Sequence, residues 1–117
     1  MAELAKSLLG KPFKMGAVGP EAFDNSGFVY YCLSQTGVDC PRFTEAMYAA
    51  GKPVEKEALV PGDLVFFYND TPGSVDLVGL YIGDGEFVSC NNENSPTAIR
   101  KLNAFYYAEH YVGARRY

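Results

Sequence analysis

Four side chains of this 117-residue chain carry the groups from which a thiol-based hydrolase could be built: Cys32, Cys40, Cys90 and His110. A nucleophilic thiol needs a nearby base or a helix N-terminus to lower its pKa. Helical spacing puts Cys32 in the middle of a helix, and strand alternation turns Cys90 away from the face that Ser89 presents. A lone histidine near the start of the last predicted strand is typical of a surface or packing residue. These residues alone therefore do not assemble a hydrolase site.

The cysteine and acidic residues do not predict a metal or a cofactor. Three cysteines without C-x-x-C spacing indicate neither a disulfide framework nor a zinc site. We expect three small buried side chains, with one disulfide and a free thiol as the alternative. Asp70, Asp76, Asp84 and Glu86 are scattered around predicted turns and form no ligand cluster. No phosphate-loop or dinucleotide fingerprint is present, so we predict no cofactor.

The elements that must position these residues follow an α+β pattern, with helices mainly in the first half and strands in the second. Apolar spacing predicts helices over residues 2–9, 25–36 and 44–50, and strands over 64–68, 77–82, 86–90, 97–101 and 111–116. Asp24 is the expected N-cap of the second helix, and Gly37 its left-handed stop. Successive hairpins indicate an antiparallel sheet of five to six strands packed on this helix, in a single domain spanning residues 1–117.

Composition excludes two classes of function. The net charge is −4, and Arg115-Arg116 is the only basic cluster, which argues against nucleic-acid binding. No run of about 18 apolar residues predicts a membrane span. The first residues lack the pattern of a secretory signal, which leaves a cytoplasmic protein, export by another route, or a piece of a longer chain.

Several motifs share the order and spacing of one known family over most of the chain. They are Leu9-Gly10-Lys11-Pro12-Phe13, Gly16, Phe23-Asp24-x-Ser26-Gly27-Phe28-Val29, Pro41-Arg42, Pro61-Gly62-Asp63-Leu64-Val65-Phe66-Phe67, Val78-Gly79-Leu80-Tyr81-Ile82-Gly83 and Gly113-Ala114-Arg115-Arg116. Together they resemble the NlpC-type peptidoglycan endopeptidases, a compact branch of the papain-like cysteine peptidases. The resemblance implies a papain-like α+β fold with N-terminal helices packed on the sheet. It also implies an extracytoplasmic, cell-wall setting.

The resemblance further implies a catalytic triad, from which this sequence departs at all three positions. The family places a cysteine in a D-C-S-G motif, a histidine at the start of a strand, and a third polar residue on the next strand. Those positions here are Asn25, Leu77 and Ser89. A carboxamide nitrogen is a poor nucleophile because its lone pair is delocalised, and leucine cannot accept a proton. We therefore predict a catalytically inactive member with a degenerate triad.

Three functions remain open at this point. A noncatalytic module would bind a peptidoglycan stem peptide or related muropeptide, with Asn25 offering donors and an acceptor at a helix N-terminus. A protein-interaction or regulatory scaffold would use a cleft made more apolar by Leu77. An active hydrolase with rearranged machinery would depend on Cys32, Cys90 or His110. The predicted ligand-binding residues are Phe13, Met15, Asp24, Asn25, Ser26, Asp76, Leu77 and Ser89.

Overall fold

The computed structural model describes all residues from Met1 to Tyr117. The helices are α1 (Ala2–Ser7), α2 (Asn25–Gln35), α3 (Thr44–Ala50), the 3-10 helix η1 (Lys56–Ala58) and α4 (Phe105–His110). The strands are β1 (Lys52–Val54), β2 (Leu64–Phe67), β3 (Leu77–Gly83), β4 (Glu86–Ser89), β5 (Ala98–Lys101) and β6 (Tyr111–Arg116). None of the helices is both long and apolar enough to cross a membrane.

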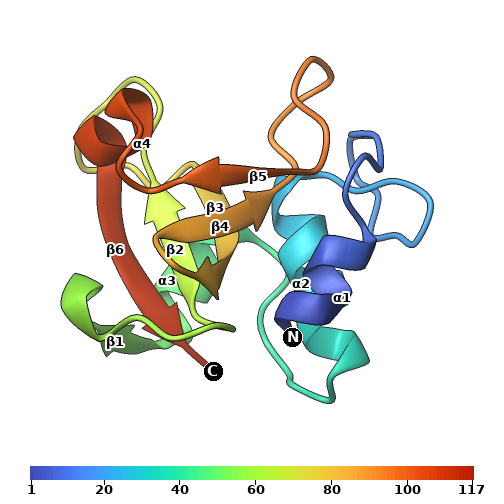
Figure 1. Cartoon of the computed structure of the whole chain (residues 1–117), viewed down its shortest axis with the longest axis horizontal. Coiled ribbons are helices and arrows are strands. Elements are labelled where there is room, and N and C mark those ends of the chain that lie inside the picture. Colours follow the sequence, from blue (N-terminus) through green and yellow to red (C-terminus); the bar gives the residue numbers. More distant parts are fainter.

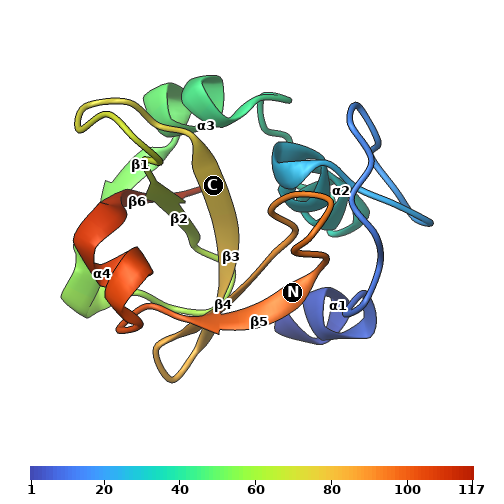
Figure 2. The same cartoon turned by 90° about the horizontal axis from the view of Figure 1, so that it is seen from above.

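The six strands form one antiparallel sheet in the order β1-β6-β2-β3-β4-β5. Figure 1 shows α1 and α2 together on one side of the molecule and the strands on the other. Seen from above, the sheet curls, with α1 and α2 beyond one face of β3 and α4 on the opposite side (Figure 2). The predicted α+β fold, with N-terminal helices on an antiparallel sheet, is confirmed.

Two apolar clusters hold the layers together. The helix-side core joins α1 and α2 to one face of the sheet and includes Phe28, Leu64 and Phe66. The second core lies on the other face and includes Val65 and Phe67. Because successive side chains of a strand point to opposite faces, β2 feeds both cores in turn. This explains why its sequence is a continuous apolar run and why all four of its residues are buried.

Helix α2 begins and ends as its sequence predicts. The Asp24 carboxylate accepts a hydrogen bond from the Gly27 amide at 2.6 Å and so caps the first turn. After the C-cap Thr36, Gly37 has a φ of 79°, a conformation that glycine adopts without steric cost. These local signals fix the position of Asn25 as the first residue of the helix.

Three short elements were not predicted from the sequence. Strand β1 has only three residues, is mostly exposed, and is defined by its pairing with β6. The 3-10 helix η1 is also three residues long and exposed. Helix α4 has no side-chain N-cap and no buried residue, so it lacks the usual signals of a helix. His110 lies near the start of the last strand, as expected, and is the last residue of α4, immediately before β6.

Candidate functional site

An open cleft of about 320 Å³ lies where the N-terminus of α2 faces the start of β3. The loop before α2 and the start of α3 supply the remaining walls. Seven of the eight predicted ligand-binding residues line it: Phe13, Met15, Asp24, Asn25, Ser26, Asp76 and Leu77. Residues more than 50 positions apart in the sequence therefore meet in one cleft.

Ser89 is the predicted residue that does not line the cleft. Its side chain is 2% exposed and donates a hydrogen bond to the Asn91 Oδ1 at 2.7 Å. Asn91 lines the cleft in its place. The two residues are two positions apart, so the same-face rule for extended chains could have pointed to Asn91.

Three other residues of the cleft wall were also missed: Phe43, Thr44 and Asn69. Phe43 and Thr44 stand at the start of α3, and Asn69 follows the end of β2. No motif marks them, because only the packing of α3 and of the 69–76 loop brings them to the N-terminus of α2.

The Asn25 carboxamide is bonded into the sheet. Its Nδ2 donates to the carbonyl oxygens of Val78 at 3.1 Å and Cys90 at 2.9 Å, and its Oδ1 accepts from the Val78 amide at 2.8 Å. Continuing the register of β3 and β4 from Leu80 and Val88 by two residues brings Val78 opposite Cys90. The carboxamide thus bridges the two strands beyond the end of their ladder.

This geometry corrects one expectation. We predicted that Asn25 would offer its donors to a ligand, but both N–H groups are already engaged by Val78 and Cys90. A carboxamide has two donors and two acceptor lone pairs, so only one lone pair of the Asn25 Oδ1 remains free. Asn25 shapes the cleft wall and ties α2 to the sheet.

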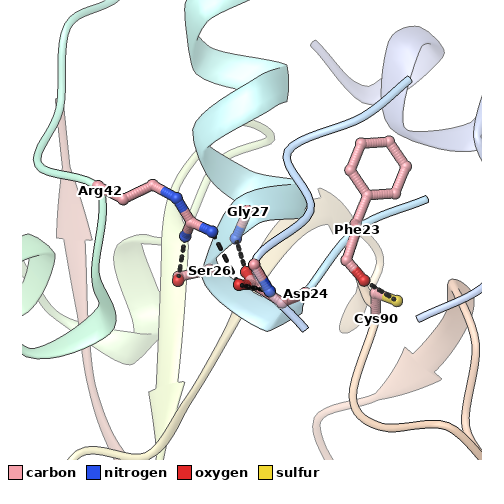
Figure 3. A network of polar contacts seen from close by, with 7 residues as sticks. Phe23, Asp24, Ser26, Gly27, Arg42 and Cys90 are labelled. Carbon is pink, nitrogen blue, oxygen red and sulfur yellow. Dashed lines mark hydrogen bonds and ion pairs between the residues drawn. The ribbon is translucent and has the colours of Figure 1, made fainter. Parts of the chain in front are cut away.

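An ion pair with Arg42 holds two residues of the cleft wall, Asp24 and Ser26, beside Asn25. The Arg42 guanidinium donates to the Asp24 carboxylate and to the Ser26 hydroxyl, each at 2.7 Å (Figure 3). Asp24 also accepts from the Gly16 amide at 3.0 Å, which holds the preceding loop against the helix. Asp24 is 8% exposed, and its negative charge is balanced by Arg42. The prediction that Asp24 has a structural role is confirmed.

Gly27 allows the loop before α2 to approach the first turn of the helix closely. A Cβ atom there would collide with the Ala17 carbonyl oxygen and lie 2.7 Å from the Asp24 carboxylate. Since the Ala17 oxygen is backbone and accepts from the Asp24 amide, it cannot move aside easily. A side chain at residue 27 would therefore push the loop off the helix N-terminus.

Leu77 and Asp76 form the opposite wall. Leu77 is half-buried and packs against the second core. The Asp76 carboxylate accepts from the Asn69 amide at 2.8 Å and the Ser74 hydroxyl at 2.6 Å, and no lysine, arginine or histidine pairs with it. No basic residue lines the cleft, so Asp76 is its uncompensated charge.

The remaining thiols and the histidine lie outside the cleft wall. Cys32 and Cys90 are buried, as predicted, but Cys40 is only half-buried, and all three are free. Burial raises the pKa of the Cys32 thiol to about 12 and also raises the pKa of Cys40 and Cys90. His110 stacks on Tyr106 with ring centroids 4.1 Å apart, and its Nδ1 lies 2.7 Å from the Tyr106 carbonyl oxygen. No group of three or more His, Cys, Asp or Glu side chains is gathered as a metal site would require.

These pKa directions predict a simple labelling pattern. At pH 8 iodoacetamide should modify Cys40 slowly and leave Cys32 and Cys90 unmodified, because burial keeps both thiols neutral and inaccessible. In urea all three should react, as counted by intact-mass spectrometry. The Cys32 pKa is raised in the folded state, so its contribution to stability is complete below the unfolded pKa and is lost as pH rises towards about 12. Labelling of Cys32 ahead of Cys40 in the native protein would contradict the predicted labelling pattern.

Comparisons with known proteins agree with the fold. The model of the NlpC/P60 family matches residues 10–116. Murein DD-endopeptidase MepH of Escherichia coli is 38% identical over 112 residues, which cover 92% of this chain and 41% of that protein. γ-D-glutamyl-L-lysine dipeptidyl-peptidase of Bacillus cereus is 38% identical over 113 residues, covering 96% of this chain and 34% of the relative. The crystal structure of an NlpC/P60 family protein from Bacillus cereus has a TM-score of 0.93 at 37% identity, covering 98% of this chain and 38% of the other. The chain spans less than half the length of these proteins, and it belongs to the NlpC/P60 family.

Proposed function

We propose that this domain is a noncatalytic NlpC/P60 module that binds a peptidoglycan stem peptide, or a related muropeptide, in the cleft. The observation that carries the proposal is the hydrogen bonding of Asn25. At the helix N-terminus, where the family resemblance assigns a thiolate, a carboxamide is tied to Val78 and Cys90. The cleft beside it is nevertheless open, with a volume of about 320 Å³.

The chemistry of the other cleft residues supports a loss of hydrolysis. Attack on a peptide carbonyl needs a nucleophile and a proton acceptor within hydrogen-bonding distance. The Ser26 hydroxyl accepts from Arg42, a cation that cannot take its proton. Leu77, at the histidine position, has no group that could do so. The raised pKa of each cysteine thiol also argues against a relocated cysteine nucleophile.

The charge of the cleft indicates the charge of its ligand. Asp24 is neutralised by Arg42, while Asp76 has no cationic partner. A ligand with an ammonium group near the exposed Asp76 carboxylate would gain a modest attraction that solvent screens. The Bacillus cereus relative is named for γ-D-glutamyl-L-lysine, and a peptide of that kind carries a lysine ammonium.

A noncatalytic member of the fold is known. RipD of Mycobacterium tuberculosis is described as a non-catalytic NlpC/p60 domain protein adapted to peptidoglycan binding. It shares the fold of this chain with a TM-score of 0.74 at 22% identity. RipD is a precedent for the kind of function proposed, and the argument for this chain rests on its own residues.

The test is a titration with a peptide that contains γ-D-glutamyl-L-lysine. We expect calorimetry to show binding, NMR shifts to map to the cleft, and mass spectrometry to show the peptide intact after long incubation. Asp76→Asn should weaken binding about 2- to 5-fold, in line with the loss of one exposed charge pair worth up to about 1 kcal/mol. Asp84→Asn, an exposed aspartate outside the cleft, is the matched control and should leave affinity unchanged. Cleaved peptide, or no binding at millimolar peptide, would overturn the proposal.

One observation favours a second candidate, a protein-interaction or regulatory scaffold. Met15 and Phe43 line the cleft and are 80% and 65% exposed, which is high for large apolar side chains. A protein partner could bury both. If the peptide fails to bind, loss of partner binding in a Met15→Ser/Phe43→Ser variant would support this candidate.

A further inference from the structure

The third triad position leads to a hydrogen-bonded chain of side chains that ends in the cleft. Ser89 is bonded to the Asn91 Oδ1 at 2.7 Å, and the Asn91 Nδ2 is bonded to the Tyr107 hydroxyl at 3.0 Å. Ser89 is buried, and Asn91 is half-buried in the cleft wall. We propose that Asn91 binds a peptide bond of the ligand, accepting its N–H and donating to its C=O. This proposal rests on the proposed function and names a specificity-determining residue for it.

Counting donors and acceptors supports the assignment. A carboxamide has two N–H donors and two acceptor lone pairs. Ser89 and Tyr107 engage one of each, which leaves Asn91 one donor and one acceptor. Both hydroxyls can donate or accept, so the count is the same for either orientation of the amide. A peptide bond presents the matching pair, one C=O and one N–H.

The Asn91 side chain is also held in place before any ligand arrives. Tyr107 packs against Phe67 and Phe87, with ring centroids 5.1 and 5.0 Å away. Ser89 is fixed on β4, which pairs with β5 at Ala98. An amide anchored at both ends loses little rotational freedom on binding, so its hydrogen bonds contribute more to affinity.

Three other polar side chains of the cleft are less suited to this role. Both N–H groups of Asn25 are engaged in the sheet, and Asp24 is paired with Arg42. Asn69 is exposed and has one side-chain partner, the Tyr106 hydroxyl. Asn91 combines a free donor and acceptor with an anchor on each side.

The test is a chemical double-mutant cycle with the γ-D-glutamyl-L-lysine peptide and analogues in which each peptide N–H is replaced in turn by an ester oxygen. Asn91→Ala should weaken binding of the parent peptide about tenfold, the effect of two amide hydrogen bonds of about 0.7 kcal/mol each. One ester analogue should bind the wild type more weakly but bind Asn91→Ala as well as the parent peptide does. A residue that only supports the fold would not produce this coupling.

The controls separate this inference from the proposed function. Asn103→Ala changes an exposed asparagine outside the cleft and should bind like wild type. If the wild type binds the peptide and Asn91→Ala binds it equally, or if every ester costs both proteins the same, the Asn91 assignment fails and the proposed function stands. If the wild type does not bind, both fail. Asn91-dependent binding of N-acetylmuramic acid without peptide would assign the amide to the sugar and overturn the peptide-bond assignment.

Discussion

Replacing Asn25 with alanine should lower the free energy of unfolding by about 3–4 kcal/mol. The change removes three hydrogen bonds and leaves the Val78 N–H and the carbonyls of Val78 and Cys90 without their partner. Each polar group buried without a partner costs about 1–3 kcal/mol, and water entering from the cleft should recover part of this. Urea denaturation followed by circular dichroism measures the change.

Two further variants make the Asn25 prediction specific. Asn103→Ala, an exposed asparagine with no hydrogen bond in the structure, should change stability by less than about 0.5 kcal/mol. Asn25→Cys should destabilise nearly as much as Asn25→Ala, because a thiol cannot replace a carboxamide that bonds three backbone groups. A cysteine variant as stable as the wild type would show that the Asn25 carboxamide does not hold α2 to the sheet.

The Asn25 prediction bears directly on any test of the proposed triad positions. Placing cysteine at residue 25 and histidine at residues 77 and 89 would remove the bridge between β3 and β4. The buried Ser89 and the half-buried Leu77 would also have to give way to larger imidazoles. Stability and activity must therefore be measured together in such a variant, because a failure to cleave could follow from unfolding alone.

Replacing Asp24 with alanine should cost about 3 kcal/mol and should abolish ligand binding in the cleft. Asp24 caps α2 through Gly27, anchors the preceding loop through Gly16 and pairs with Arg42. Loss of an N-cap costs about 1 kcal/mol, and leaving a partly buried arginine unpaired adds to this. The Ser26 and Arg42 side chains should then lose their fixed positions. Denaturant unfolding and peptide titration measure the two effects.

An exposed aspartate provides the control for Asp24. Asp39 has no hydrogen bond or ion pair and is exposed, so Asp39→Ala should change stability by less than about 0.5 kcal/mol and leave binding intact. Asp24→Asn keeps an acceptor for Gly27 but loses the charge beside Arg42, and should fall between alanine and wild type. If Asp24→Ala unfolds like wild type, the network around Arg42 contributes nothing to the helix N-terminus.

The sequence allowed much of this site to be predicted because several of its determinants are local. Asp24 and Gly37 lie next to the ends of α2 and act on residues within a few positions, so their roles follow from residue type and spacing. The strand patterns and the family motifs predicted the sheet. Seven of eight proposed cleft residues lie in the cleft, because they flank the motifs that the family retains.

The part that could not be predicted depends on contacts between distant segments. Asn25 bonds to residues 53 and 65 positions away, and no local pattern reports that its donors are taken. Ser89 was expected in the cleft, but it is buried and bonded to Asn91, two residues further along the chain, which lines the cleft in its place. Helix α4 has no side-chain cap and no buried face from which it could be predicted. Its Tyr107 is held by aromatic contacts with β2 and β4.

The sequence by itself determined that the chain belongs with the NlpC-type proteins and where α2 begins, and it predicts that Asn25, Leu77 and Ser89 stand at the triad positions. Only the tertiary structure decided what these side chains do. Residue type determines which hydrogen bonds a side chain can form, whereas the packing of α2 against β3 and β4 determines which of them are already formed. For Asn25 that packing engages both donors, and for Asn91 it leaves one donor and one acceptor free.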